Sequence, residues 1–426
     1  MRKKALGRGV SIIGTSNLPQ RTFDDPEFKD LSIYELFAWA CHEAMEDAGL
    51  KSCDIDKLVY SQVANFMTCG HSLAMCGPLE EWIGMAGKPM VHIEQACASG
   101  YVAFNEAVQA VASGRYDIVL AAGVETPKHF NPYNKPAHML SPMSEYKDAW
   151  WEPGFATYDT TYYRFHGAAD KCLIDEHGRL YTNEYGISEH TLDDTYNALA
   201  VNSRRNASKN PQASQRVDYR TVAQEHGYSD VMAYMRSEHN PKITRFIRRS
   251  GLMTHNAAAG AVILCASDIA DSFRQKPVNV LDIACSTITQ REPFCFHKLN
   301  LNVYNQLKEG GQFQPEEIDL LLTTAMTAGE QIDAAEVFGY LPAGEGYKYE
   351  LDGRTCFDGD RPINTHGGDL SYGHSYGVCG LNWVGEAVQQ LRGTAGERQV
   401  KNARTSLVRG MGGAHTSAAT LLRVQD

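Results

Sequence analysis

The sequence contains the same pattern of segments twice, in the same order. An apolar segment that begins at Gly100 and ends at Gly114 has a counterpart that begins at Gly380 and ends at Gly393, as helices closed by glycine do. Apolar strands accompany each helix, and they are expected at 55–61, 118–122 and 258–266 in the first half and at 318–324, 405–408 and 418–424 in the second. Strands that alternate with helices predict a mixed α/β fold, here built from two duplicated halves.

The two halves differ in length because of one long insertion. Residues 127–250 are rich in Tyr, His, Pro and Asn, and they include a polar helix expected at 189–206. We therefore predict a first half formed by residues 1–126 and 251–275, an inserted loop domain at 127–250, and a second half at 276–426.

The first half contains an early segment with clear helix signals. Ser32 and Glu35 have the spacing of a capping box, apolar residues follow on one face, and Gly49 lies where the pattern ends. This segment is predicted to be a helix.

One cysteine lies where its thiol would be activated. Cys97 stands between an extended apolar segment at 90–93 and a helix that opens at Ser99 and Gly100. The positive end of a helix dipole favours the thiolate, which is the nucleophilic form of cysteine. Cys97 is therefore predicted to be a catalytic nucleophile.

The second half carries a glycine-rich loop, 364–380, at the position that matches Cys97. If the halves pack about a pseudo-twofold axis, the starts of the two repeated helices meet and Cys97 faces His374. An imidazole beside a thiol can take its proton, so that the thiolate attacks a carbonyl group in acyl transfer. The alternative is a buried structural cysteine and a loop histidine, but the duplicated placement favours catalysis.

Four motifs resemble those of the thiolase superfamily, in the same order and over almost the whole chain. They are Cys97-Ala98-Ser99, Asn364-x-x-Gly367-Gly368, Gly373-His374-Ser375 and Gly410-Met411-Gly412-Gly413-Ala414. Within the superfamily, the chain is most similar to the sterol-carrier or lipid-transfer type. The resemblance implies an α/β fold of five layers, α-β-α-β-α, with a loop domain in the first half.

The resemblance also implies roles for particular residues. Cys97 would become acylated, and His374 would be the base that activates it and helps to hold the thioester oxygen of the substrate. The main-chain N–H groups of Cys97 and Gly410 would form an oxyanion hole, which stabilises charge as it develops.

The chain departs from the thiolase pattern at two catalytic segments. The second catalytic cysteine of typical thiolases corresponds here to Val408, and the segment that often reads His-Asp-Cys-Phe in the lipid-transfer type is Thr323-Thr324-Ala325-Met326. Neither segment supplies the usual acid and base for the substrate α-carbon, and a second donor for the thioester oxygen is missing. Cys379 is the remaining candidate for the acid/base role. The alternative is that Cys379 is only a small residue packed at a helix start.

Other residues are candidates for substrate contact. His366 lies in the same loop as His374, although such a histidine more often caps a turn. A basic patch of Lys242, Arg245, Arg248 and Arg249 suits the phosphates of CoA or an acidic acyl group, and a solvated helix face is the alternative. An aromatic cluster in the insertion suits an acyl pocket, and it consists of Trp150, Trp151, Tyr158, Tyr162, Tyr163 and Phe165.

Composition limits the partners of the 426-residue chain. Its formal net charge of -11 argues against nucleic acid or an anionic membrane as the main partner. Eleven cysteines without Cys-x-x-Cys spacing, and a start without signal-peptide features, suit a reducing cytoplasm and no metal site in this chain. No apolar run approaches the roughly 20 residues needed to span a bilayer.

We therefore expect a cytoplasmic acyltransferase of the thiolase type, with coenzyme A as co-substrate. It would cleave a β-ketoacyl-CoA with free CoA, or run the reverse Claisen condensation, through an acyl-cysteine. The aromatic insertion suggests an aromatic or dicarboxylic substrate such as 2-benzoylsuccinyl-CoA. The resemblance implies a homodimer, and the altered segments favour a small zinc-bearing OB-fold partner. Two alternatives remain: an aldolase for β-hydroxyacyl-CoA, and a non-catalytic lipid-binding or scaffold subunit.

Overall fold

Nine strands form one hydrogen-bonded sheet in the described part of the chain, which comprises residues 6–22, 25–63, 76–126, 175–288, 295–413 and 416–425 of a computed structural model. The strands are β1 (Val10–Thr15), β2 (Lys57–Ser61), β3 (Met90–Ile93), β4 (Ile118–Glu125), β5 (Ala258–Ala266), β6 (Val278–Thr287), β7 (Leu320–Thr323), β8 (Thr405–Gly412) and β9 (Thr416–Val424). Their order across the sheet is β3-β2-β4-β5-β1-β6-β9-β8-β7. The two sequence halves therefore meet at the antiparallel pair β1 and β6.

The sheet repeats the same pairing in each half, which confirms the duplication expected from the sequence. In the first half β2 is parallel to β4, β4 is antiparallel to β5, and β5 is antiparallel to β1. In the second half β7 is parallel to β8, β8 is antiparallel to β9, and β9 is antiparallel to β6. Strand β3 is an additional edge strand, parallel to β2, and it leads directly to Cys97.

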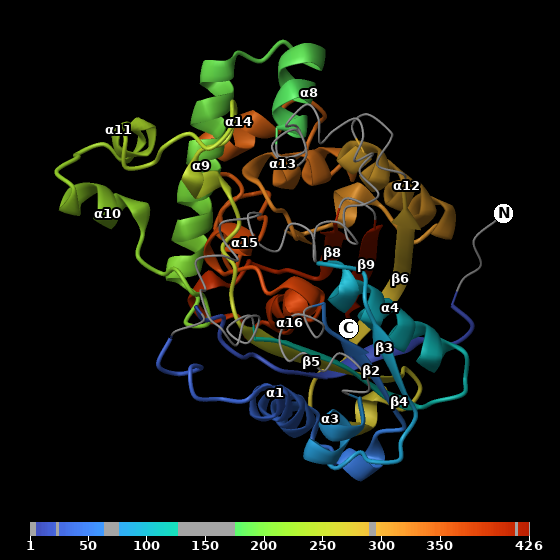
Figure 1. Cartoon of the computed structure of the whole chain (residues 1–426). Coiled ribbons are helices and arrows are strands. Elements are labelled where there is room, and N and C mark those ends of the chain that lie inside the picture. Colours follow the sequence, from blue (N-terminus) through green and yellow to red (C-terminus); the bar gives the residue numbers. More distant parts are fainter. Residues whose placement is uncertain are drawn as a thin grey trace, which may run out of the picture.

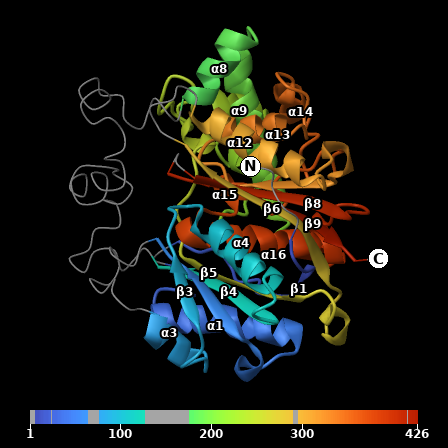
Figure 2. The ribbon, with the colours of Figure 1, turned by 90° about the vertical axis from the view of Figure 1, so that its right-hand side faces the viewer.

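Helices cover both faces of each half-sheet (Figure 1). The helices outside the insertion are α1 (Ile33–Ala48), α3 (Cys76–Trp82), α4 (Ser99–Ala112), α12 (Cys295–Gly310), α13 (Ala328–Val337), α14 (Gly346–Leu351), α15 (Gly368–Ser371) and α16 (Cys379–Arg392). Figure 2 shows α4 and α16 between the two half-sheets, α1 and α3 outside the first, and α12 and α13 outside the second. This is the predicted five-layered α-β-α-β-α arrangement.

The predicted cap of helix α1 is also confirmed. The Ser32 hydroxyl accepts a hydrogen bond from the Glu35 N–H, and the Glu35 carboxylate accepts one from the Ser32 N–H. Gly49 ends the helix in the left-handed conformation, with φ of 74°. The apolar face, including Leu36 and Phe37, is buried in the core beneath the first half-sheet.

The two central helices touch backbone to backbone near their first residues. A Cβ atom added at Gly380 would lie 2.2 Å from the Tyr101 nitrogen, and one added at Gly100 would lie 2.8 Å from the Gly377 carbonyl oxygen. Distances below 3 Å leave no room for a side chain, so this approach requires glycine on both helices. The approach brings together the loops that precede α4 and α16, and these loops carry Cys97 and His374.

The described part of the insertion packs against the second half. It contains α8 (Glu176–Glu184), α9 (Glu189–Ser208), α10 (Tyr219–Glu225) and α11 (Val231–Arg236). Helix α9 matches the helix expected at 189–206, and its Leu192 and Leu199 share a buried cluster with Ile332 of α13. The predicted aromatic cluster at 150–165 lies outside the described residues. None of the described helices has the length and apolar character needed to cross a bilayer.

Candidate active site

Cys97 lies in a tight turn between β3 and α4. The Ser99 hydroxyl accepts the Gln95 N–H at 2.8 Å and donates to the Ala96 carbonyl at 2.6 Å. Ala96 has φ of 48°, a left-handed conformation that residues with a side chain seldom adopt and that recurs at functional sites. The turn leaves Cys97 partly exposed at the start of α4, where its thiol can meet a substrate.

His374 faces Cys97 from the glycine-rich loop of the other half. Its Nε2 atom lies 3.0 Å from the Cys97 sulfur, although the residues are 277 positions apart in sequence. The imidazole is fully buried. Its backbone N–H donates to the Thr254 carbonyl at 2.6 Å, and its carbonyl accepts the Asn256 N–H at 2.9 Å. The structure thus brings together the pair that the repeat predicts.

Asp369 supports the other side of the histidine ring. One carboxylate oxygen lies 2.6 Å from His374 Nδ1, and the other accepts the Ala325 N–H at 2.7 Å. A carboxylate at Nδ1 keeps the proton there, so that Nε2 is free to accept the proton of Cys97. Sequence analysis missed Asp369. The available signal was an acidic residue in the glycine-rich loop, five positions before the histidine.

The surroundings also stabilise a protonated His374. Burial lowers its pKa, but the negative charges that Cys379 and Cys97 can carry, together with the hydrogen bond to Asp369, raise the pKa well above its usual value. This environment can therefore hold a proton taken from Cys97 on the imidazole, which would leave the sulfur as a thiolate.

Cys379 lies on the side of the imidazole away from Cys97. Its sulfur is 3.5 Å from His374 Nδ1 and 3.9 Å from the Ser375 hydroxyl. The thiol is fully buried, and burial raises its pKa. This position behind the histidine does not favour direct contact with a substrate, so the acid/base role of Cys379 remains a prediction.

The ligand atoms of Asp369, His374 and Cys379 lie within 4.8 Å of one another, close enough to hold a metal ion. The hydrogen bond between Asp369 and His374 Nδ1 accounts for this spacing, because it already occupies both atoms. The cluster is therefore explained by the hydrogen bond that supports the His374 ring.

Strand β8 approaches the Cys97 turn through its glycines. A Cβ atom at Gly412 would lie 2.1 Å from the Gln95 carbonyl oxygen, and one at Gly410 would lie 1.9 Å from the Tyr101 ring. Gly412 therefore touches the turn itself, whereas Gly410 lies against the first turn of α4. The oxyanion hole formed by the N–H groups of Cys97 and Gly410 remains a prediction.

The two positions that depart from the thiolase pattern, residues 323–326 and Val408, have side chains that pack or form hydrogen bonds inside the protein. Val408 is fully buried and apolar. The Thr324 hydroxyl lies 2.5 Å from the Tyr101 hydroxyl, and the Thr324 carbonyl accepts a hydrogen bond from the buried Arg409 guanidinium at 2.9 Å. The side chains of Thr324 and Val408 are therefore committed to the interior.

The structure does not bring His366 to the Cys97 and His374 pair. Its ring is fully buried, 4.4 Å from the Trp383 ring and 4.6 Å from the Tyr372 ring. Burial lowers its pKa to about 4. A small cavity beside it is lined by polar residues that include the buried ion pair of Glu386 and Arg398.

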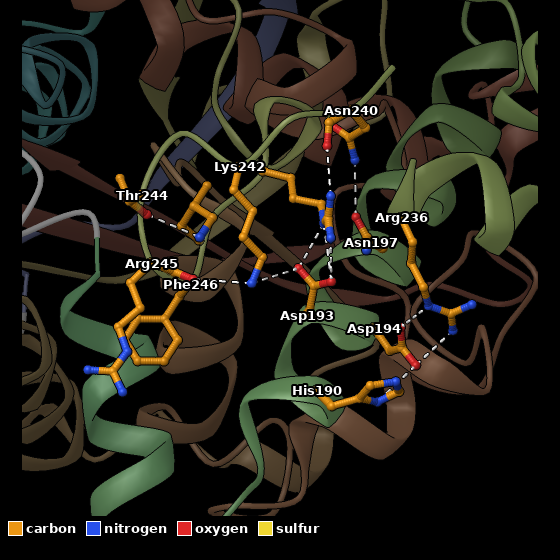
Figure 3. Close-up of polar contacts among 12 residues, drawn as sticks. His190, Asp193, Asp194, Asn197, Arg236, Asn240, Lys242, Thr244, Arg245 and Phe246 are labelled. Carbon is orange, nitrogen blue, oxygen red and sulfur yellow. Dashed lines mark hydrogen bonds and ion pairs between the residues drawn. The ribbon is translucent and has the colours of Figure 1, made fainter. Parts of the chain in front are cut away.

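Most side chains of the predicted basic patch form ion pairs with carboxylates of the insertion (Figure 3). Arg248 makes a bidentate contact with Asp193 at 2.9 to 3.1 Å, and Lys242 lies 3.7 Å from the same carboxylate. Arg245 pairs with Glu189. Arg249 is exposed, and its side chain has no hydrogen-bond or ion-pair partner among the residues that the structure describes. Among these four basic residues, only Arg249 therefore has a guanidinium without an ion-pair partner in the described part of the chain.

Family models identify the class of protein that this fold and site define. The thiolase N-terminal domain model matches residues 10–221, and the model described as thiolase C-terminal domain-like matches residues 287–423. The chain belongs to the thiolase family.

Individual relatives are similar over most of their length. Acetyl-CoA acetyltransferase of Methanothermobacter thermautotrophicus is 30% identical over 419 residues, covering 97% of this chain and 98% of the relative. Sterol carrier protein 2 of Gallus gallus is 23% identical, covering 96% and 71%. The benzoylsuccinyl-CoA thiolase subunit BbsB of Thauera aromatica is 25% identical, covering 83% and 84%. These relatives agree with the resemblance predicted from the motifs.

A solved structure with the same fold is the Ltp2-ChsH2(DUF35) aldolase. It aligns with a TM-score of 0.71 at 18% identity, and the alignment covers 99% of each chain. At this level of identity, the likeness shows the shared fold alone.

Proposed function

We propose that this protein is an acyl-CoA C-acyltransferase of the thiolase type, with Cys97 as the residue that carries the acyl group. The observation that carries the proposal is the hydrogen-bonded series of Cys97, His374 and Asp369, with distances of 3.0 and 2.6 Å. A scaffold subunit has no use for a partly exposed thiol next to a buried imidazole and carboxylate. Membership of the thiolase family supports the same reaction class.

The proposed reaction proceeds in two steps. In the first, His374 takes the proton of Cys97, and the sulfur attacks the β-keto carbon of a β-ketoacyl-CoA. The bond between the α- and β-carbons breaks, its electron pair passes into the enolate of the departing thioester, and the proton taken from Cys97 ends on the α-carbon, which yields an acyl-CoA. In the second step, His374 takes the proton of the CoA thiol, the CoA sulfur attacks the acyl-Cys97, and the Cys97 thiolate leaves and regains that proton as the second acyl-CoA is released. The same steps in reverse give Claisen condensation.

The substrate is proposed to be an aromatic or dicarboxylic acyl-CoA, such as 2-benzoylsuccinyl-CoA. Support comes from the relative named benzoylsuccinyl-CoA thiolase subunit and from the aromatic composition of residues 150–165. The exposed and uncommitted Arg249 is the proposed contact for a CoA phosphate, because its segment leads within six residues to the loop beside His374.

We also propose that the chain works as a homodimer in the cytoplasm with a small zinc-bearing OB-fold partner. The edge position of β3, whose outer side has no neighbouring strand among the described residues, supports pairing between two copies. One relative is named as a thiolase subunit, and one structural neighbour is named as a complex with a DUF35 protein. Co-expression with the adjacent reading frame, followed by measurement of mass and zinc content, tests this proposal.

Covalent trapping distinguishes the proposed acyltransferase from the alternatives. The purified chain, alone and with its genomic neighbour, is incubated with a β-ketoacyl-CoA in the absence of free CoA, and the protein is analysed by intact mass and peptide mapping. The expected result is an acyl adduct on Cys97 that free CoA removes, and no adduct in Cys97→Ala. Cleavage of a β-hydroxyacyl-CoA without an adduct would identify an aldolase, the activity for which one structural neighbour is named. No adduct and no cleavage would favour the scaffold.

A further inference from the structure

We infer that His255 is a further catalytic residue, whose imidazole N–H works beside His374 to hold the thioester carbonyl oxygen of the substrate. The inference rests on the proposed function. In that reaction the thioester oxygen becomes negatively charged when the carbon-carbon bond breaks, and each donor aimed at such an oxygen lowers the barrier. His374 provides one donor once it holds the proton of Cys97, and a second donor is needed.

The backbone places His255 next to His374. Residues Thr254 and Asn256, on either side of His255, make the two hydrogen bonds that hold the His374 backbone, so the two histidines form a parallel bridge. Their ring centres are 5.9 Å apart, with the planes nearly perpendicular at 76°. The His255 ring also stacks on Tyr376 at 4.8 Å, with only 10° between the planes. The orientation of His255 is therefore fixed by packing on both neighbours.

The surroundings of His255 indicate which ring nitrogen carries the proton. Its Nδ1 atom is buried and has no hydrogen-bond partner among the described residues, although the residue as a whole is partly exposed. A buried N–H group without an acceptor is rarer in proteins than an acceptor that lacks a donor. The tautomer with a bare Nδ1 and a proton on Nε2 is therefore favoured, and Nε2–H is the donor that the ring can offer.

The same surroundings keep His255 neutral. Burial, with a smaller contribution from the nearby His374, lowers the pKa of His255 to about 3. A neutral imidazole at physiological pH donates a hydrogen bond without being a strong acid, which suits it to stabilising an oxyanion. His255 and His374 thus have different roles: one stays neutral and donates, and the other accepts and returns a proton.

Neighbouring residues are less suited to this role. The Thr324 hydroxyl is buried and bonded to Tyr101, Val408 has no polar group, and Cys379 is buried behind His374. His255 combines a free donor, partial exposure and a position beside the catalytic histidine. Its place in the segment before β5 explains why motif comparison with the second half did not reveal it.

Three substitutions test the inference. His255→Ala removes the ring, His255→Phe keeps a ring that can stack on Tyr376 but has no donor, and His255→Gln restores side-chain N–H donors. We expect kcat for thiolysis to fall by about 10² to 10³ in the Ala and Phe variants, as when one oxyanion-hole donor is removed. The kcat of the Gln variant should be at least tenfold higher than that of the Phe variant. Iodoacetamide labelling of Cys97 should stay within about threefold of wild type in all three, because His374 still activates the thiol.

The outcomes separate the inference from the proposed function. His190→Ala, a change at a histidine with 81% side-chain exposure in the insertion, is the control and should leave kcat unchanged. Near-normal kcat in folded Phe and Ala variants would overturn the role of His255. Slow labelling of Cys97 in these variants would show that His255 only positions His374, which also overturns the inference. If wild type itself forms no acyl-Cys97, the proposed function fails. Thermal unfolding identifies any variant that does not fold. If His255→Ala fails to fold, the ratio of kcat between His255→Gln and His255→Phe tests the need for a hydrogen-bond donor.

Discussion

The carboxylate of Asp369 lies 2.6 Å from the ring nitrogen of His374 that points away from Cys97. His374, the proposed base, is therefore oriented by the carboxylate of Asp369, which itself does not contact the Cys97 thiol. Both residues are buried, so water does not compete for the hydrogen bond.

The first prediction concerns this pair. Asp369→Asn should lower kcat by about 10³ to 10⁴, because an amide donates to Nδ1 and leaves Nε2 protonated and unable to accept the Cys97 proton. Steady-state thiolysis measures the rate, and iodoacetamide labelling of Cys97 should slow in parallel. Asp358→Asn is the control, since Asp358 pairs with Arg205 at the surface. A loss below tenfold in Asp369→Asn would argue against the supporting role.

The second prediction concerns Cys379. Cys379→Ser should lower kcat by less than tenfold, because the thiol is fully buried and lies beside His374 Nδ1, on the side of the ring away from Cys97. Cys265→Ser, a buried site on β5, controls for the cost of burying a hydroxyl group. A fall greater than 10²-fold with normal labelling of Cys97 would instead support the acid/base role predicted from the sequence.

The third prediction concerns CoA binding at the basic patch. Arg249→Ala should raise KM for CoA about 5- to 10-fold with little change in kcat, because one charge-assisted phosphate contact is lost. Arg245→Ala is the matched control, since the side chain of Arg245 is already paired with Glu189. Initial rates over a range of CoA concentrations give both constants. Equal effects of the two substitutions would refute a specific phosphate contact.

The fourth prediction concerns stability and pH. Although burial alone would raise the pKa of Glu386, Arg398 and then His366 hold it at about 2. Glu386→Gln should lower the free energy of unfolding by about 3 to 5 kcal/mol at neutral pH, because Arg398 is left buried without its partner.

The sign of the pH dependence follows from the depressed pKa of this carboxyl. Its ionised form stabilises the fold fully above the pKa of the unfolded chain, and this contribution is lost as the pH falls toward about 2. The stability gap between wild type and Glu386→Gln, measured by urea unfolding, should therefore be constant from pH 8 to 5 and shrink below that. Glu397→Gln, at an exposed pair with Lys209, should leave stability unchanged. A gap that widens on acidification would contradict the assignment.

Features repeated along the chain were predictable from sequence. The matched segments indicated the order of strands and helices in both halves, and the pseudo-twofold arrangement of those halves placed Cys97 opposite His374. Both conclusions depend on patterns that extend over tens of residues, so single substitutions do not obscure them.

Features that depend on side-chain direction were not predictable. His366 and His374 share one glycine-rich loop, but one packs on Trp383 and the other faces Cys97. Arg248 and Arg249 are adjacent, but only Arg248 meets a carboxylate. Asp369 and His255 acquire their importance from contacts with His374 that depend on how separate segments come together.

The crossing of α4 and α16 also sets the distance between the two residues of the proposed site, Cys97 and His374. Because Gly100 and Gly380 let the two backbones touch, the helix crossing fixes how closely the preceding loops bring the Cys97 sulfur and the His374 imidazole together. A single methyl group added at this crossing would push apart Cys97 and His374, which belong to different halves of the chain. A substitution at Gly100 or Gly380 in one half would therefore also displace the site residue that the other half contributes.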